Sequence, residues 1–213
     1  MYAAAVRSQS LWAAASGSMD DAADEVISRV SVLAGKGCPS SDEISACAAQ
    51  CSAALKPVGA QVSLAGIVYD GNALNMFNIG NARSLLFSRG YALLHSDDHT
   101  EAYSMMLERG ANGGGAYDEL RYMAESRMLL RALGNSDADN LQFYEPYDPK
   151  KDDAFLICTD SFWRFISVVE MELDYRKAAG PEEWAKIMTR RVLMRAGKQL
   201  DSENFAVCAA MVE

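Results

Sequence analysis

An acidic residue closes an apolar stretch in the C-terminal half of the chain: Asp160 follows the strand-like run LICT, residues 156–159. A carboxylate at the end of a buried strand is well placed to bind a metal ion. Divalent ions such as Mg²⁺ and Mn²⁺ prefer oxygen ligands, and a pair of them can turn a shared water into a nucleophile. The first question is therefore whether Asp160 belongs to a working metal site or to the remains of one.

Histidines and cysteines offer less. His99, in the run DDHT, is expected to shape a loop, and no role is assigned to His95. Cys47 and Cys51 extend an apolar helical stripe, so they are interpreted as core residues; zinc is not expected because a fourth ligand is missing. The odd number of cysteines predicts free thiols in a reducing compartment. The five are Cys38, Cys47, Cys51, Cys158 and Cys208.

Composition narrows the class of partner. The chain has 213 residues, a net charge of −9 and a pI of about 4.8. Nucleic-acid backbones and anionic membranes attract basic surfaces, so neither is an expected partner. No apolar run reaches the 18 or so residues of a membrane-spanning helix. The first residues lack the basic opening and apolar block of a secretion signal, so we expect a cytoplasmic protein.

Periodicity predicts a mixture of helices and antiparallel strands. Ser18 is expected to cap a first helix that ends at Gly35, with Asp21 in the capping box. A turn at Asp-Gly-Asn predicts a hairpin over 61–80, and a second hairpin is expected over 84–96. Hairpins imply antiparallel sheet, and amphipathic helix pairs need sheet faces to cover, so we expect an α+β sandwich forming a single domain over 1–213. Further helices are expected at 41–55, 167–177 and 181–196, and further strands at 2–15, 141–145, 154–159 and 205–212.

Four motifs, in order, resemble those of the metal-dependent Ser/Thr protein phosphatases of the protein phosphatase 2C (PPM) type, in their compact bacterial form. NIGNARSLLFSRGYALLHSDDHT (78–100) resembles the family's Asn-Val-Gly-Asp-Ser-Arg run, hairpin and Asp-His-Ser/Thr. LLRALG (129–134) resembles Arg-Ala-Leu-Gly, and LICTDSFW (156–163) resembles Leu-Cys-Ser-Asp-Gly-Leu/Trp. SENFAVCAAMV (202–212) resembles the closing Asp-Asn-Phe/Tyr strand.

The resemblance implies a fold and a chemistry. The fold would be a four-layer α-β-β-α sandwich, with two antiparallel sheets flanked by helix pairs. Carboxylates at one end would hold two Mg²⁺ or Mn²⁺ ions, which share a water and aim it at a phosphoserine or phosphothreonine ester. The substrate or partner implied is a phosphoprotein, a kinase or another signalling protein.

Several expected ligands are replaced. The family's bridging aspartate stands in Ala-Asp-Gly before the first helix, and the matching residues here are Ser16 and Gly17. A neutral hydroxyl cannot offset the repulsion between two dications. Asn81 replaces a further aspartate. The family's earlier strand carries another acid, and none of the ten residues before Leu11 is acidic, so that region is interpreted as shortened. Arg7 is a candidate substitute for the family's phosphate-binding arginine.

Other ligands are kept. Asp160 matches a metal-binding aspartate, although Ser161 takes the place of the following glycine. Glu203 replaces the last aspartate with the charge retained, and Asn204 is also retained. Asp20 and Asp21 could assist, but capping and first-turn charge account for them.

The favoured hypothesis is a pseudophosphatase that retains the fold, has a degraded two-metal site and acts by binding or regulation, with no tightly bound cofactor. The alternative is a divergent but active Ser/Thr phosphatase that uses Mg²⁺ or Mn²⁺. A further interpretation is that the sequence begins inside a longer protein and lacks its first strand. The missing strand would then supply one of the acids, but Ser16 would be unchanged.

Overall fold

Two antiparallel sheets form the centre of the computed structural model, which describes residues 2–19, 21–110, 114–135, 140–197 and 204–212. The first sheet has the strand order β1-β2-β3-β4-β7 and the second β6-β5-β8-β9. Strands of the first sheet are β1 (Tyr2–Arg7), β2 (Leu11–Gly17), β3 (Val62–Tyr69), β4 (Leu74–Ile79) and β7 (Gln142–Phe143). Strands of the second are β5 (Arg83–Ser88), β6 (Tyr91–His95), β8 (Ala154–Cys158) and β9 (Val207–Met211).

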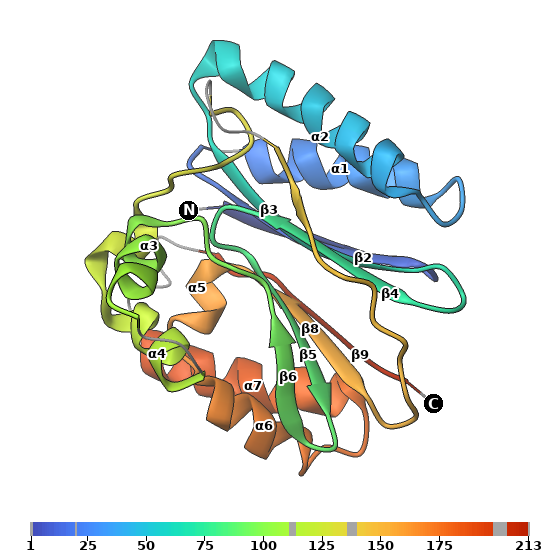
Figure 1. Ribbon diagram of the computed structural model, residues 1–213, viewed down its shortest axis with the longest axis vertical. Coiled ribbons are helices and arrows are strands. Elements are labelled where there is room, and N and C mark those ends of the chain that lie inside the picture. Colours follow the sequence, from blue (N-terminus) through green and yellow to red (C-terminus); the bar gives the residue numbers. More distant parts are fainter. Residues whose placement is uncertain (1, 20, 111–113, 136–139, 198–203, 213) are drawn as a thin grey trace.

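Helices cover the two outer faces (Figure 1). The first sheet is covered by α1 (Ala22–Ala34) and α2 (Ser41–Leu55), and the second by α6 (Val168–Tyr175) and α7 (Pro181–Ala196). The short helix α5 (Asp160–Trp163) follows β8 directly. Beside it lies a helical segment made of α3 (Glu101–Glu108), α4 (Gly114–Glu119) and the 3₁₀ turns η2 (Leu120–Tyr122) and η3 (Ala124–Arg127). A further 3₁₀ turn, η1 (Lys56–Val58), follows α2.

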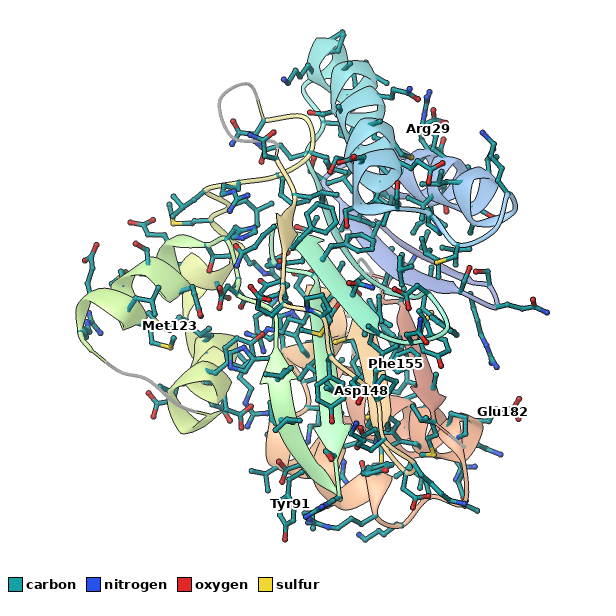
Figure 2. All side chains as sticks on the ribbon, turned by 45° about the vertical axis from the view of Figure 1, so that its right-hand side comes forward. Arg29, Tyr91, Met123, Asp148, Phe155 and Glu182 are labelled. Atoms are coloured by element: carbon teal, nitrogen blue, oxygen red, sulfur yellow. The ribbon has the colours of Figure 1, made fainter. Side chains whose placement is uncertain are left out.

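Three apolar clusters fill the spaces between the four layers. One packs α1 and α2 on the first sheet and includes Val26 and Ile44. Another lies between the sheets, where Phe155, labelled in Figure 2, meets Trp12 with ring centroids 4.9 Å apart. The third packs α6 and α7 on the second sheet and includes Trp184. The fold is therefore the predicted α+β, four-layer α-β-β-α sandwich.

The alternation of side chains along β2 places Ser16. Successive residues of a strand point to opposite faces of its sheet. Ala13 and Ala15 pack with the helices, while Ala14 packs between the sheets. Ser16 continues the inward-facing series of Ala14 and lies at the end of the strand, paired with Ala3 and Ser63.

Most element predictions agree with the structure. The helices predicted at 41–55 and 181–196 have the bounds of α2 and α7, and both hairpins form as β3–β4 and β5–β6. The predicted cap of the first helix is wrong: the cap position is Asp21, which makes no side-chain capping hydrogen bond. The Ser18 hydroxyl instead accepts a hydrogen bond from the Gln61 backbone N–H at 3.1 Å, so Ser18 extends the pairing of β2 with β3.

No helix among the described residues is long and apolar enough to cross a membrane. All five cysteines are free thiols, with Cys51 and Cys158 buried and Cys38 exposed.

Candidate functional site

Ser16 and Asp160 meet at one end of the sandwich. The Ser16 hydroxyl donates a hydrogen bond of 3.3 Å to Oδ1 of Asp160. The residues come from different sheets, since Ser16 ends β2 and Asp160 opens α5 after β8. Both are buried, with exposed fractions of 4% and 0%. The structure therefore brings together Ser16 and Asp160, two positions that the motif resemblance singled out.

The donors at this position do not match a pair of hard dications. Two Mg²⁺ or Mn²⁺ ions need several oxygen ligands, mainly carboxylates, to offset their charge. A serine hydroxyl is neutral and cannot supply a bridging charge. Within the described ranges, no group of three or more histidine, cysteine, aspartate or glutamate side chains is arranged to hold a metal ion. The described residues thus do not fit a two-metal centre.

Glu203 and Asp20 lie outside the described residues. The chain just after Glu203 is placed: Asn204 is exposed, and the Ala206 N–H donates to the Thr159 hydroxyl at 3.0 Å. The Thr159 N–H donates to the Ala206 carbonyl at 3.1 Å. The start of β9 is therefore tied to the residue that directly precedes Asp160.

Asn81 takes part in a local hydrogen-bond network. Its Oδ1 accepts from the Ser63 hydroxyl at 2.9 Å, and its Nδ2 donates to the Ser126 carbonyl at 3.1 Å. Its backbone carbonyl accepts from the Trp163 indole N–H at 2.8 Å. An aspartate here would place an acceptor against the Ser126 carbonyl, so the amide suits this position and links the β4–β5 turn to η3, while the backbone carbonyl links the turn to α5.

Gly17 and Ser161 are positions of close packing. A Cβ added to Gly17 would lie 3.2 Å from the Ala23 backbone nitrogen and 3.3 Å from the Ala22 Cβ, which is tighter than ordinary contact. The absence of a side chain at Gly17 lets the first turn of α1 approach the end of β2. Ser161 is fully buried in α5.

Arg7 is not brought to this site. It is exposed at the end of β1 and pairs with Trp12, whereas Ser16 pairs with Ala3. Arg7 lies four positions along the strand from Ala3, roughly 13 Å at the usual rise of a strand. In this structure Arg7 therefore lies toward the other end of the sheet from Asp160.

A buried ion pair next to the site was not predicted from the sequence. Arg83 donates from Nε and Nη2 to the two carboxylate oxygens of Asp98, at 2.9 and 2.6 Å. Its guanidinium lies between the rings of Tyr117 and Trp163, 3.9 and 3.5 Å from their centroids. Burial opposes the charged form, but the Asp98 carboxylate outweighs this and raises the pKa of Arg83. The pair joins β5, the DDHT loop, α4 and α5.

His99 shapes the loop, as predicted. Its Nδ1 accepts from the Gly80 N–H at 3.1 Å, so the ring proton sits on Nε2, 2.7 Å from Oε1 of Gln142. Burial lowers the pKa of His99, and the nearby Arg131 lowers it further. Gln142 in turn donates to Asp97 at 2.9 Å. The motif therefore connects the β4–β5 turn to β7 through a neutral imidazole.

The fold consists of two stacked antiparallel sheets between helix pairs, with the Asp160 carboxylate at one end of the sandwich (Figure 1). A scan of protein-family models and a search of curated proteins give no match. Solved structures do match, and they are PPM-type Ser/Thr phosphatases.

Two of these structures cover nearly the whole chain. The Mycobacterium tuberculosis Ser/Thr phosphatase PstP aligns with a TM-score of 0.79 at 19% identity, over 99% of this chain and 92% of that one. Staphylococcus aureus Stp1 aligns with a TM-score of 0.80 at 12% identity, over 100% and 88%.

A third match is the PstP catalytic domain solved with two manganese ions, at a TM-score of 0.77 and 18% identity over 99% and 91% of the two chains. At these identities the likeness establishes the fold: this chain has the fold of PPM-type Ser/Thr phosphatases.

Proposed function

We propose that this chain is a pseudophosphatase, a PPM-type fold that binds phosphorylated signalling proteins without metal-dependent hydrolysis. The observation that carries the proposal is the contact between Ser16 and Asp160 at 3.3 Å. It supports the alignment that puts a neutral residue where the family has a bridging carboxylate. A site with a hydroxyl in that place loses the charge that would hold two dications together.

The proposed partner is a phosphoprotein, a kinase or another signalling protein. The fold supports this choice, since the solved structures that match it are Ser/Thr phosphatases. The free state of all five cysteines supports a reducing compartment such as the cytoplasm.

The test is calorimetric titration of Mn²⁺ into the purified chain, followed by an activity assay of the same sample on a phosphothreonine peptide. We expect millimolar or weaker binding and no release of phosphate. Tight binding of two ions with turnover would contradict the proposal, because it would require a centre rebuilt from other acids.

A divergent but active Mg²⁺- or Mn²⁺-dependent phosphatase is the second candidate. Asp160 is an acid that matches a metal-binding aspartate of the family, and it is fully buried; in the sequence, Glu203 keeps the charge of the family's last aspartate. This candidate predicts Mn²⁺-dependent turnover that Asp160→Asn abolishes. Turnover that survives Asp160→Asn would exclude Asp160 as an essential ligand.

A further inference from the structure

A cavity of about 420 Å³ lies where η2, α5, α6 and α7 meet. Arginines from three elements line it: Arg121 in η2, Arg164 at the end of α5 and Arg195 in the last turn of α7. Glu170 is the acidic residue among those that line it. Among its lining residues, guanidinium groups therefore outnumber carboxylates, in a chain whose net charge is −9.

The carboxylate of Glu170 is already engaged within the fold. It accepts from Arg195 Nη1 at 2.6 Å and from the Ser167 N–H at 3.0 Å, where it completes the capping box of α6. The hydrogen bond from Arg195 is the main reason that the pKa of Glu170 falls to about 2. Glu170 therefore already has partners in Arg195 and in the cap of α6.

Arg121 and Tyr122 present donors to the same cavity. Arg121 Nη2 donates to the Tyr122 hydroxyl at 2.6 Å, and its guanidinium lies 4.7 Å from the centroid of that ring. The Nε of Arg121 is shielded from solvent and has no hydrogen-bond acceptor among the described residues. An N–H donor that is shielded from solvent without an acceptor is stabilised by an incoming anion. Figure 2 labels Met123, the residue that directly follows Tyr122 in the chain.

We propose that this arginine pocket, formed by Arg121, Arg164 and Arg195, binds the phosphate group of a phosphorylated protein. Guanidinium groups bind phosphate through paired N–H donors, and clusters of arginines are a recurring phosphate-recognition device. A phosphate ester carries close to two negative charges at neutral pH, which suits a lining in which guanidinium groups outnumber carboxylates. A peptide carboxylate carries one negative charge and two oxygen acceptors, fewer than the three acceptor oxygens of a phosphate ester.

The position of the pocket links it to the proposed function, on which this inference rests. Arg164 follows Asp160 by one helical turn, and its backbone N–H donates to the Asp160 carbonyl at 3.1 Å. A phosphoprotein held by the pocket would therefore lie beside the end of the sandwich where Ser16 meets Asp160.

The experiment uses a fluorescein-labelled peptide with one phosphothreonine among alanines, and the same peptide with threonine. Anisotropy is measured on the full chain in the presence of a chelator. We expect the phosphopeptide to bind, the plain peptide not to bind, and inorganic phosphate to compete. Arg121→Gln and Arg164→Gln should each weaken binding about tenfold or more, since each removes charged hydrogen bonds.

Arg190→Gln is the matched control. It removes the same charge from an exposed position on α7 that does not line the cavity, and it should leave the affinity within about twofold. Equal losses in all three variants would overturn the proposal, because they would indicate attraction by net charge alone. Binding of inorganic phosphate without binding of the phosphopeptide would overturn it too, since the site would then serve free phosphate.

Failure of the pocket and failure of the pseudophosphatase proposal give different results. Asp160→Asn should leave phosphopeptide binding unchanged. Loss of binding in that variant would indicate that the phosphate binds at the end of the sandwich near Asp160, and this would overturn the proposed arginine pocket. Turnover with Mn²⁺ would contradict the pseudophosphatase but would not alter the affinities measured with chelator.

Discussion

Asp98 and Asp160 are both buried acids near strand ends, with exposed fractions of 2% and 0%, yet they face different partners. Asp98 receives two hydrogen bonds from the guanidinium of Arg83. Asp160 receives the neutral hydroxyl of Ser16. Burying a carboxylate costs free energy unless charge or hydrogen bonds compensate it. The compensation at Asp98 is a cation of the chain itself, which makes that pair part of the scaffold.

The comparison separates scaffold from chemistry. The residues that join the β4–β5 turn, the DDHT loop and α5 form complete networks around Arg83 and Asn81. Ser16, which the motif resemblance aligns with the family's bridging aspartate, offers Asp160 a neutral hydroxyl. The pseudophosphatase proposal requires a change only among the metal ligands, because the networks around Arg83 and Asn81 depend on other residues.

The largest expected effect comes from breaking the charged pair. Arg83→Met leaves Asp98 buried without its cation and removes the contacts with Tyr117 and Trp163, so the free energy of unfolding should fall by about 3–5 kcal/mol. Urea denaturation followed by circular dichroism measures it. Arg83→Lys keeps the positive charge but cannot donate the two parallel hydrogen bonds to Asp98, so it should lower the free energy of unfolding by less. A loss below about 1 kcal/mol in Arg83→Met would mean that the pair contributes little to the scaffold.

A smaller effect on stability is expected when a negative charge is introduced at Ser16, next to Asp160. Ser16→Asp would place a second carboxylate against Asp160, so without metal the free energy of unfolding should fall by about 2 kcal/mol through like-charge repulsion. Millimolar Mn²⁺ should recover most of this loss, because a ligand that binds only the folded state stabilises it. Thermal unfolding with and without Mn²⁺ measures both quantities.

Ser16→Asn is the control for that variant. It adds a side chain of similar size without charge, so its stability should not respond to Mn²⁺. An equal response to Mn²⁺ in the original chain and in both variants would show that Ser16 does not face the cation.

The layers of the fold could be predicted from the sequence because they depend on local patterns. Helical spacing of apolar residues predicted α2, and turn residues between alternating strands predicted both hairpins. The failure at Ser18 has a local cause: its hydroxyl and backbone pair with Gln61, 43 residues away, and a capping pattern cannot report such a contact.

The site was only partly predictable, for a related reason. The motifs located Ser16 and Asp160, and these two residues, 144 positions apart, do meet. The pairing of Arg83 with Asp98 was missed although both lie in quoted motifs, because spacing along the chain does not determine which charges face each other. The pocket around Arg121, Arg164 and Arg195 has no sequence motif at all, since its arginines converge from three separate elements.

The free energy of unfolding should be constant above about pH 6.5 and should decrease below it, because of the two histidines. Burial lowers the pKa of both His95 and His99, so the folded state resists protonation and the unfolded state binds more protons below about pH 6.5. Stability should therefore be full above that pH and fall by about 1 kcal/mol between pH 6.5 and 5. The chain contains two histidines, so chemical denaturation of His99→Asn across this range should show a shallower slope. An unchanged slope would assign the whole effect to His95.

The smallest effect is expected at a third carboxylate, Glu170, and it isolates the role of burial. Glu170 pairs with Arg195 as Asp98 pairs with Arg83, but the side chains are 21% and 41% exposed instead of 0% and 3%. Glu170→Gln should lower the free energy of unfolding by only about 0.5–1 kcal/mol, because solvent screens the pair, and 1 M NaCl should reduce that loss further. Asp98→Asn, measured in parallel, should cost several times more and respond little to salt. Glu170→Gln also removes the carboxylate that pairs with Arg195, so phosphopeptide binding at the arginine pocket should tighten while stability falls. Two losses of equal size would mean that burial does not separate the pairs, and the contrast between Asp98 and Asp160 would then need another cause.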